Sequence, residues 1–189
     1  MLKGLFGKLF GTSNPELTTQ QTSTIEHTNR EPSHSRTLER IKQPDSEVRK
    51  IWLKVIGSES KSNDITILEK VVLAKEKETN AVDLHFAYMA LFRHYYRAKD
   101  STPSQDEKFL LFALKDVDLF PRFKREYLAT HDHQVLPSIP SFKQLAIFYE
   151  KQGNYQKAIE ISEKALSYGL EDKTKGGYAA RIEKLKKKM

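Results

Sequence analysis

The 189-residue sequence contains no cysteine and no long uninterrupted apolar run. The first absence excludes a disulfide framework, a zinc site built from thiolates and a cysteine nucleophile. The second excludes a segment of the roughly 20 apolar residues that span a bilayer. The N-terminus also lacks the small-residue cleavage site of a secretory signal. We therefore expect a cytoplasmic protein, with a membrane association left open by the first eleven residues.

The sequence also lacks the short motifs that carry common enzyme chemistry. It has no phosphate-binding glycine loop, no dinucleotide fingerprint and no serine-hydrolase elbow. His131, Asp132 and His133 form the densest cluster of metal-ligand residue types, but a zinc site needs a third or fourth ligand and supporting hydrogen bonds. We predict a protein that is not an enzyme and that holds no cofactor and no metal.

Acidic and basic residues are both frequent, with a formal net charge of +7 and a sequence pI near 9.4. Charges of mixed sign are typical of a solvated helical surface, and no base-reading motif accompanies them. The basic residues at the C-terminus favour the dipole of a final helix, and the alternative is contact with a phosphate backbone or an acidic tail of a partner; they are Arg181, Lys184, Lys186, Lys187 and Lys188. We do not expect nucleic acid as a partner, and a basic nucleic-acid-binding accessory role is kept only as an alternative.

Residues 1–11 form an amphipathic N-terminal segment. Helical spacing places five large apolar side chains on one face, namely Leu2, Leu5, Phe6, Leu9 and Phe10. Because glycines weaken so short a helix, it should form only against a membrane surface or an apolar groove. We expect an anchor to an anionic membrane surface or to a partner, and the alternative is packing on the protein's own domain.

Residues 12–44 are rich in Thr, Ser, Gln and Pro, and they contain few large apolar side chains. Such a stretch cannot bury enough surface to offset its ordering entropy, so we predict a flexible linker and a disordered N-terminal region. From residue 45 onward the apolar residues follow helical spacing without strand alternation. The sequence therefore predicts one all-α domain over residues 45–189.

Capping residues and apolar spacing divide this domain into helices. Apolar residues occur nearly all the way round the helix that Asn80 opens, which predicts the central and most buried helix. Asp45 or Ser46 and then Asn63 or Ser62 should begin the two helices before it. Ser104 with Glu107 forms a capping box for the next helix, which should end before Pro121, with a short helix following over residues 121–128.

The stretch from residue 141 to 169 has the residues of a helical hairpin. Ser141 with Gln144 forms a second capping box, and Gly153 supplies the left-handed turn that only glycine adopts cheaply. Asn154 can cap the second helix, and Gly169 should end it. A final helix near the C-terminus should cover this hairpin.

This hairpin resembles the tetratricopeptide repeat (TPR) family. The resemblance rests on small residues and aromatics in the family's pattern: Leu145, Ala146, Tyr149, Gly153, Tyr155, Ala158, Ala165 and Leu166. Ser162 and Leu170 depart from that pattern, and a degenerate second unit covers residues 84–117. The resemblance implies antiparallel helical hairpins stacked as a short right-handed superhelix.

The family's usual role implies a non-catalytic adaptor that holds a peptide or helix of a protein partner. In that arrangement the first helix of each hairpin lines the groove. The residues implied for partner binding are Tyr88, Arg93, Tyr96, Lys143, Ile147 and Lys151. A peripheral protein tethered to a membrane by residues 1–11 is an alternative function, and neither function identifies the partner.

Overall fold

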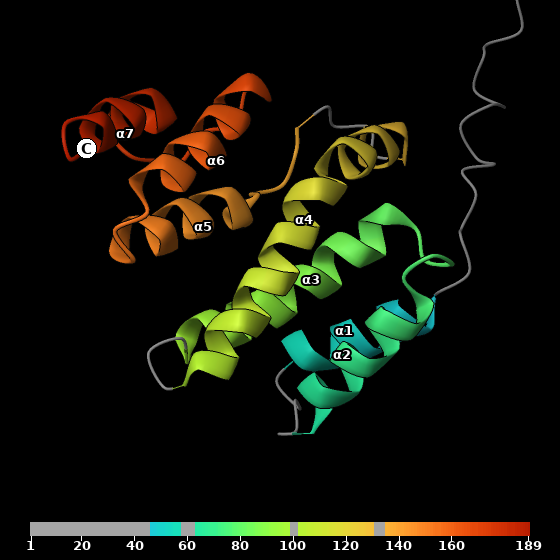
Figure 1. Cartoon of the computed structure of the whole chain (residues 1–189). Coiled ribbons are helices and arrows are strands. Elements are labelled where there is room, and N and C mark those ends of the chain that lie inside the picture. The colour runs from blue at the N-terminus through green and yellow to red at the C-terminus, as the bar shows by residue number, and fades with distance from the viewer. Residues whose placement is uncertain (1–45, 58–62, 99–101, 131–134) are drawn as a thin grey trace, which may run out of the picture. The chain divides into compact units, whose positions relative to one another are not determined.

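The computed structural model describes residues 46–57, 63–98, 102–130 and 135–189, and these residues form seven α-helices and no strand (Figure 1). The prediction of an all-α domain is confirmed. The predicted anchor, the predicted linker and the His131–His133 cluster lie outside these residues. The helices are α1 (Glu47–Ile56), α2 (Asp64–Lys75), α3 (Ala81–Arg97), α4 (Pro103–Thr130), α5 (Pro140–Lys151), α6 (Tyr155–Ser167) and α7 (Gly177–Lys186).

Three of the predicted helix caps are formed. The Ser46 hydroxyl accepts the Arg49 amide at 3.0 Å at the start of α1. The side chain of Asn80 accepts the Asp83 amide at 2.8 Å, and that of Asn154 accepts the Lys157 amide at 3.1 Å. Each cap satisfies an amide that has no partner within its own helix, so these helix starts are specified locally.

The two predicted capping boxes are wrong, because α4 and α5 begin earlier than expected. α4 begins at Pro103 and the Thr102 carbonyl accepts its first helical bond, so Ser104 lies inside the first turn. α5 begins at Pro140, which leaves Ser141 buried and without a capping bond. Proline suits the first helical position because its fixed φ matches the helix and its missing N–H would have no partner there.

α4 does not end before Pro121 but continues to Thr130. Phe120 and Phe123, on either side of the proline, are both buried, and Phe120 packs edge-on against Phe142 of α5 at 5.6 Å. Pro121 itself is exposed. The helix loses one backbone hydrogen bond on its solvent side and keeps two buried aromatic anchors, which offsets the usual cost of an interior proline.

The core is centred on α3, as predicted, and is rich in aromatic rings. Tyr96 near the end of α3 packs on Phe109 near the start of α4 at 5.2 Å, so the two helices are antiparallel. Phe109 in turn packs on Phe148 of α5 at 5.0 Å. On the other side of α3, Phe86 stacks on Trp52 of α1 at 5.2 Å. These rings join four helices into one core.

A buried polar pair interrupts this apolar core. The Nδ1 atom of His85 in α3 lies 2.6 Å from the Oδ1 atom of Asp116 in α4, and both side chains are fully buried. The His85 ring also packs against Phe123 at 4.0 Å. Within the described residues, the second polar atom of each group, His85 Nε2 and Asp116 Oδ2, has no hydrogen-bond partner. Within the described residues, each side chain therefore has the other as its sole hydrogen-bond partner.

Two equivalent hydrogen-bonded triads hold α2 against α3 and α4. Each combines a glutamate of α2 or its C-terminal cap with a tyrosine of α3 and a lysine of α4. The residues are Glu69, Tyr95 and Lys108 in one triad and Glu76, which caps α2, Tyr88 and Lys115 in the other. The two sets are seven residues apart on all three helices. Because seven residues make nearly two helical turns, the triads repeat the same three-helix contact at two levels.

In the triad around Glu76, the Tyr88 hydroxyl donates at 2.6 Å and the Lys115 ammonium at 2.8 Å. Burial acts to raise the pKa of Glu76, but the hydrogen bonds from Lys115 and Tyr88 outweigh it and leave that pKa below its usual value. Burial, reinforced by the neighbouring carboxylate, raises the pKa of the Tyr88 phenol. The triad is thus a tyrosine and a lysine bound to an ionised carboxylate.

Replacing Tyr88 by phenylalanine should lower the free energy of unfolding by about 2 kcal/mol, a typical value for a hydrogen bond to a charged group. Urea denaturation followed by circular dichroism measures this change. Tyr155→Phe is the matched control, because Tyr155 lies in a half-exposed position outside the triads. Equal stability of the two variants would contradict a structural role for the triad.

The hairpin formed by α5 and α6 has the predicted turn. Gly153 and Gly169 both adopt a φ of +71°, and each follows the end of a helix. Of the repeat positions, Leu145, Ala146, Ala158 and Ala165 are buried, and Tyr149 and Tyr155 are half-buried. Leu166 is the exception among these positions, because its side chain is 47% exposed.

α7 covers the α5–α6 hairpin as predicted, with Tyr178, Ile182 and Leu185 buried. The connection before it is held by Asp172, whose buried carboxylate accepts hydrogen bonds from Thr174 and from Arg181. The distance from Arg181 Nη2 to Asp172 Oδ2 is 2.9 Å. This connection fixes the start of α7 against the rest of the domain.

Candidate partner-binding surface

Two of the six residues predicted for partner binding belong to the fold instead. Tyr88 is only 1% exposed and is part of the triad with Glu76, so its ring lines no surface. Lys143 donates to the Asp172 carbonyl at 2.7 Å and thereby ties α5 to the connection before α7. Neither side chain is free to contact a partner without breaking a bond that the domain uses.

The other four predicted residues lie on α3 and α5, two helices that contact each other. Arg93 and Lys151 are exposed, and Tyr96 and Ile147 are half-buried. Tyr96 reaches α5 through the ring series that includes Phe109. A shared surface of these four side chains stays a prediction.

A surface that the sequence did not single out lies along the seam between α2 and α4. Leu73 is 45% exposed and falls between Glu69 and Glu76 on α2. Leu111 is 41% exposed and falls between two lysines, Lys108 and Lys115, on α4. Because the lysines bind the glutamates across the seam, the two leucines border the same seam between the two triads.

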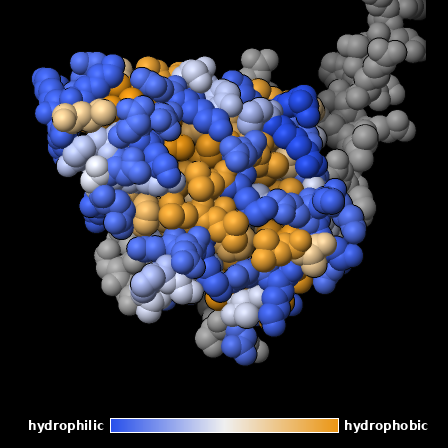
Figure 2. All heavy atoms as spheres, viewed as in Figure 1, coloured by the Kyte–Doolittle hydropathy of each residue, from blue (hydrophilic) through white to orange (hydrophobic). Residues whose placement is uncertain are grey.

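Leu114 lies one helical turn beyond Leu111 on α4 and is half-buried. We call Leu73, Leu111 and Leu114 the leucine patch. Figure 2 shows apolar side chains gathered in the middle of the view, where Figure 1 places α4, with hydrophilic residues around them. An apolar area with a polar rim is the usual appearance of a protein-binding surface.

The lysines at the edge of the leucine patch are paired with carboxylates of the same domain. Lys108 and Lys115 are engaged with the glutamates of α2, and on the far side Lys164 of α6 binds Asp118 at 3.0 Å. Cations and anions therefore alternate around the apolar area. Such an edge suits a partner with both charges and disfavours a strongly charged polymer.

The sequence does contain a signal for the leucine patch, in the seven-residue spacing of the charges. Glutamates enclose Leu73 at positions 69 and 76, and lysines enclose Leu111 at positions 108 and 115. This spacing places like charges on one helix face with a leucine between them. The pattern acquires a meaning only when the ion pairs Lys108–Glu69 and Lys115–Glu76 are known to join the two segments.

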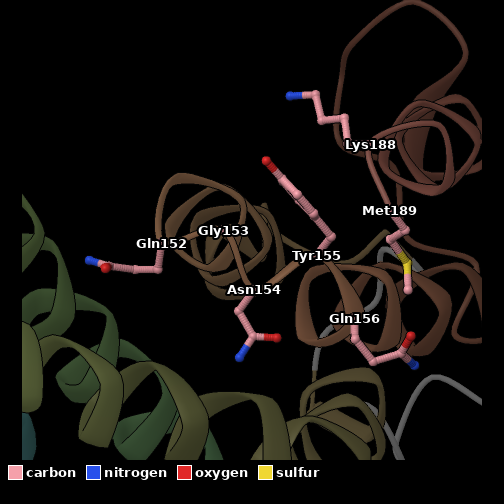
Figure 3. Close-up of a pocket in the computed structure, with 7 residues that line it drawn as sticks. All are labelled: Gln152, Gly153, Asn154, Tyr155, Gln156, Lys188 and Met189. Atoms are coloured by element: carbon pink, nitrogen blue, oxygen red, sulfur yellow. The ribbon is translucent and has the colours of Figure 1, made fainter.

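A shallow depression lies between the α5–α6 turn and the C-terminal end, with a volume of about 550 Å³. Its lining is Gln152, Gly153, Asn154, Tyr155, Gln156, Lys188 and Met189, and the Tyr155 side chain extends into the space between the turn and Lys188 (Figure 3). Lys188 is already bound to Glu150 at 2.6 Å. The depression is wide open and holds no free charged group aimed at a ligand.

The C-terminal cations bind acidic side chains of the same domain. Besides the bond from Lys188, Arg181 contacts both Asp172 and Glu150. The hydrogen bond from Lys188 is the main cause that lowers the pKa of Glu150 below its usual value. These pairs support a stabilising role for the basic end of the chain.

Neither a membrane span nor a metal cluster is found in the parts of the chain that the structure describes. None of these helices is both long and apolar enough to cross a bilayer. No group of three or more histidine, aspartate or glutamate side chains converges there. No protein-family model, no curated protein and no solved structure matches the chain.

Proposed function

We propose that the helical domain is a non-catalytic, TPR-like adaptor that binds an amphipathic helix or peptide of a protein partner. The observation that carries the proposal is the leucine patch, in which Leu73 and Leu111 are exposed between two fixed triads. An exposed leucine on a rigid seam can bury its side chain in a partner at little entropic cost. The order in which the hairpins pack supports a repeat-like array, because α4 contacts α5 and α6 contacts α7.

The chemistry of the patch defines the partner that it would fit. A helix with apolar side chains at positions i, i+3 or i+4, and i+7 could place them against Leu73, Leu111 and Leu114. Its flanking positions would meet the alternating Lys and Glu side chains of the triads. We therefore expect an amphipathic helix that carries charges of both signs beside its apolar face.

The double substitution Leu73→Ser and Leu111→Ser should weaken partner binding by about tenfold or more, because both side chains lie where a binding hot spot would be expected. The full chain and the variant would be used as baits in parallel affinity purifications with quantitative mass spectrometry. The expected result is a set of proteins that the wild-type chain enriches and the variant loses.

The matched control is the double substitution Val135→Ser and Leu166→Ser, which removes two other exposed aliphatic side chains. This control should keep the enriched set, because neither residue borders the patch. If both double variants lose the same proteins, or if both keep them, the patch is not the binding surface. Circular dichroism and thermal melting would establish that all three proteins are folded.

A further inference from the structure

The outer side of the α1–α2 hairpin carries exposed aliphatic side chains that the proposed function does not use. Leu53 and Ile56 of α1 are 45% and 58% exposed, and Ile67 of α2 is 46% exposed. The inward faces of the two helices bury Val48, Trp52, Leu68 and Val72 in the core, and Ile56 lies one turn after Trp52, at the exposed end of α1. Both helices are therefore apolar on two faces, which is unusual for a hairpin whose outer side meets only water.

Three lysines lie among these side chains. Lys50 and Lys54 are exposed on α1, and Lys70 is exposed on α2. Within the described residues, none of these three ammonium groups makes an ion pair. They differ in this respect from Lys108 and Lys115 of α4, which are bound to glutamates.

The acidic residues in the described part of the hairpin lie toward the seam with α4 or at the helix ends, where Asp64 is the first residue of α2. Glu69 and Glu76 point to the seam with α4, where the triads hold them. Glu47 lies in the first turn of α1, where it favours the helix dipole, and Glu78 binds Lys75 at the far end of α2. The middle of the outer side is therefore both apolar and positively charged.

From this combination we infer that the outer side of the α1–α2 hairpin is a docking surface for an anionic lipid bilayer. Helices that lie on membranes bury an apolar face at the headgroup level and place lysines where they meet acidic lipids. Leu53, Ile56 and Ile67 would supply the buried part, and Lys50, Lys54 and Lys70 the charge. A protein surface would need several acidic side chains in a matching layout, whereas an anionic bilayer offers negative charge at every position.

This inference is independent of the proposed adaptor function, since it uses none of the leucine patch residues. It would add a second contact to the anchor predicted for residues 1–11. Stable membrane attachment commonly takes two weak signals together.

The test measures partition of the full chain onto sedimented vesicles of phosphatidylcholine alone and of phosphatidylcholine mixed with phosphatidylserine. The variant K50E/K54E/K70E should bind the phosphatidylserine vesicles at least about a hundredfold more weakly than the wild type, because each lysine near an acidic bilayer contributes about fivefold. The variant L53S/I56S/I67S should bind about tenfold more weakly. Residues 1–11 are the same in all proteins, so their contribution cancels.

The matched control is K173E/K175E/K187E, which makes the same change in net charge at three other exposed lysines. It should weaken binding by less than about threefold, through the general field alone. Equal losses in the two lysine variants would overturn the inference, because they would show an effect of net charge only. Failure of the wild type to prefer phosphatidylserine vesicles would also overturn it, and a protein would then be the better candidate for this surface.

Discussion

Replacing Asp116 by alanine is expected to lower the free energy of unfolding by about 3–5 kcal/mol, the range seen when one partner of a buried polar pair is removed. Asp116 and His85 lie 2.6 Å apart in the core, and within the described residues neither has another hydrogen-bond partner at its remaining polar atom. The substitution would leave both nitrogen atoms of His85 buried without a partner and would also create a cavity. Urea denaturation measures the loss.

Asp118→Ala is the matched control for this substitution. It removes a carboxylate from the same helix, but Asp118 is exposed and its ion pair with Lys164 is a surface pair. Its expected cost is below about 1 kcal/mol. A double variant, H85L/D116L, should recover much of the stability lost in D116A, because an apolar pair of similar volume needs no hydrogen bonds. D116A with the stability of D118A would refute this account of the core.

Replacing Asp172 by alanine should cost about 3 kcal/mol, at the lower end of the range for a buried pair because Arg181 keeps some contact with water. The variant loses the hydrogen bonds from Thr174 and Arg181 that fix the connection before α7. Amide exchange should become faster in α7 than in α3. Glu183→Ala, which removes an exposed carboxylate of α7, should change neither quantity measurably.

The loss of unfolding free energy caused by Asp172→Ala should become smaller as the pH falls. Burial acts to raise the pKa of Asp172, but the hydrogen bonds from Thr174 and Arg181 outweigh it and hold that pKa below the unfolded value of 3.8. A carboxyl group with a lowered pKa stabilises the fold above its unfolded pKa, and this contribution is lost as the pH falls through the folded pKa. The stability difference between wild type and D172A should therefore be full at neutral pH and shrink below about pH 4. A stability difference that grew as the pH fell would contradict a lowered pKa of Asp172 in the folded state.

Features that depend on neighbouring residues were predictable from the sequence. Asn80 and Asn154 cap their helices because a side chain and an amide three residues later are enough to define the bond. Gly153 turns the chain because the left-handed conformation is cheap only for glycine. The predicted starts of α4 and α5 were wrong, because Pro103 and Pro140 begin these helices in place of the predicted serine caps.

Features that depend on which helices are neighbours were not predictable. Tyr88 lies on a helix that is apolar nearly all round, so its sequence does not reveal which aromatic rings are buried. Lys143 looks like a surface lysine until the carbonyl of Asp172 is placed beside it. The leucine patch depends on ion pairs that join α2 and its C-terminal cap to α4, and the 27 residues of α3 and its connections separate these helices in the chain. Contacts between segments so far apart in sequence leave only a weak local pattern.

The proposed binding of a protein partner through the leucine patch can be measured as a dissociation constant. The protein that the wild-type chain enriches most selectively over L73S/L111S would be produced in pure form and titrated against both by isothermal calorimetry. Relative to the wild type, we expect the dissociation constant to be at least about tenfold larger for L73S/L111S and unchanged for V135S/L166S. Equal dissociation constants for the wild type and L73S/L111S would contradict it.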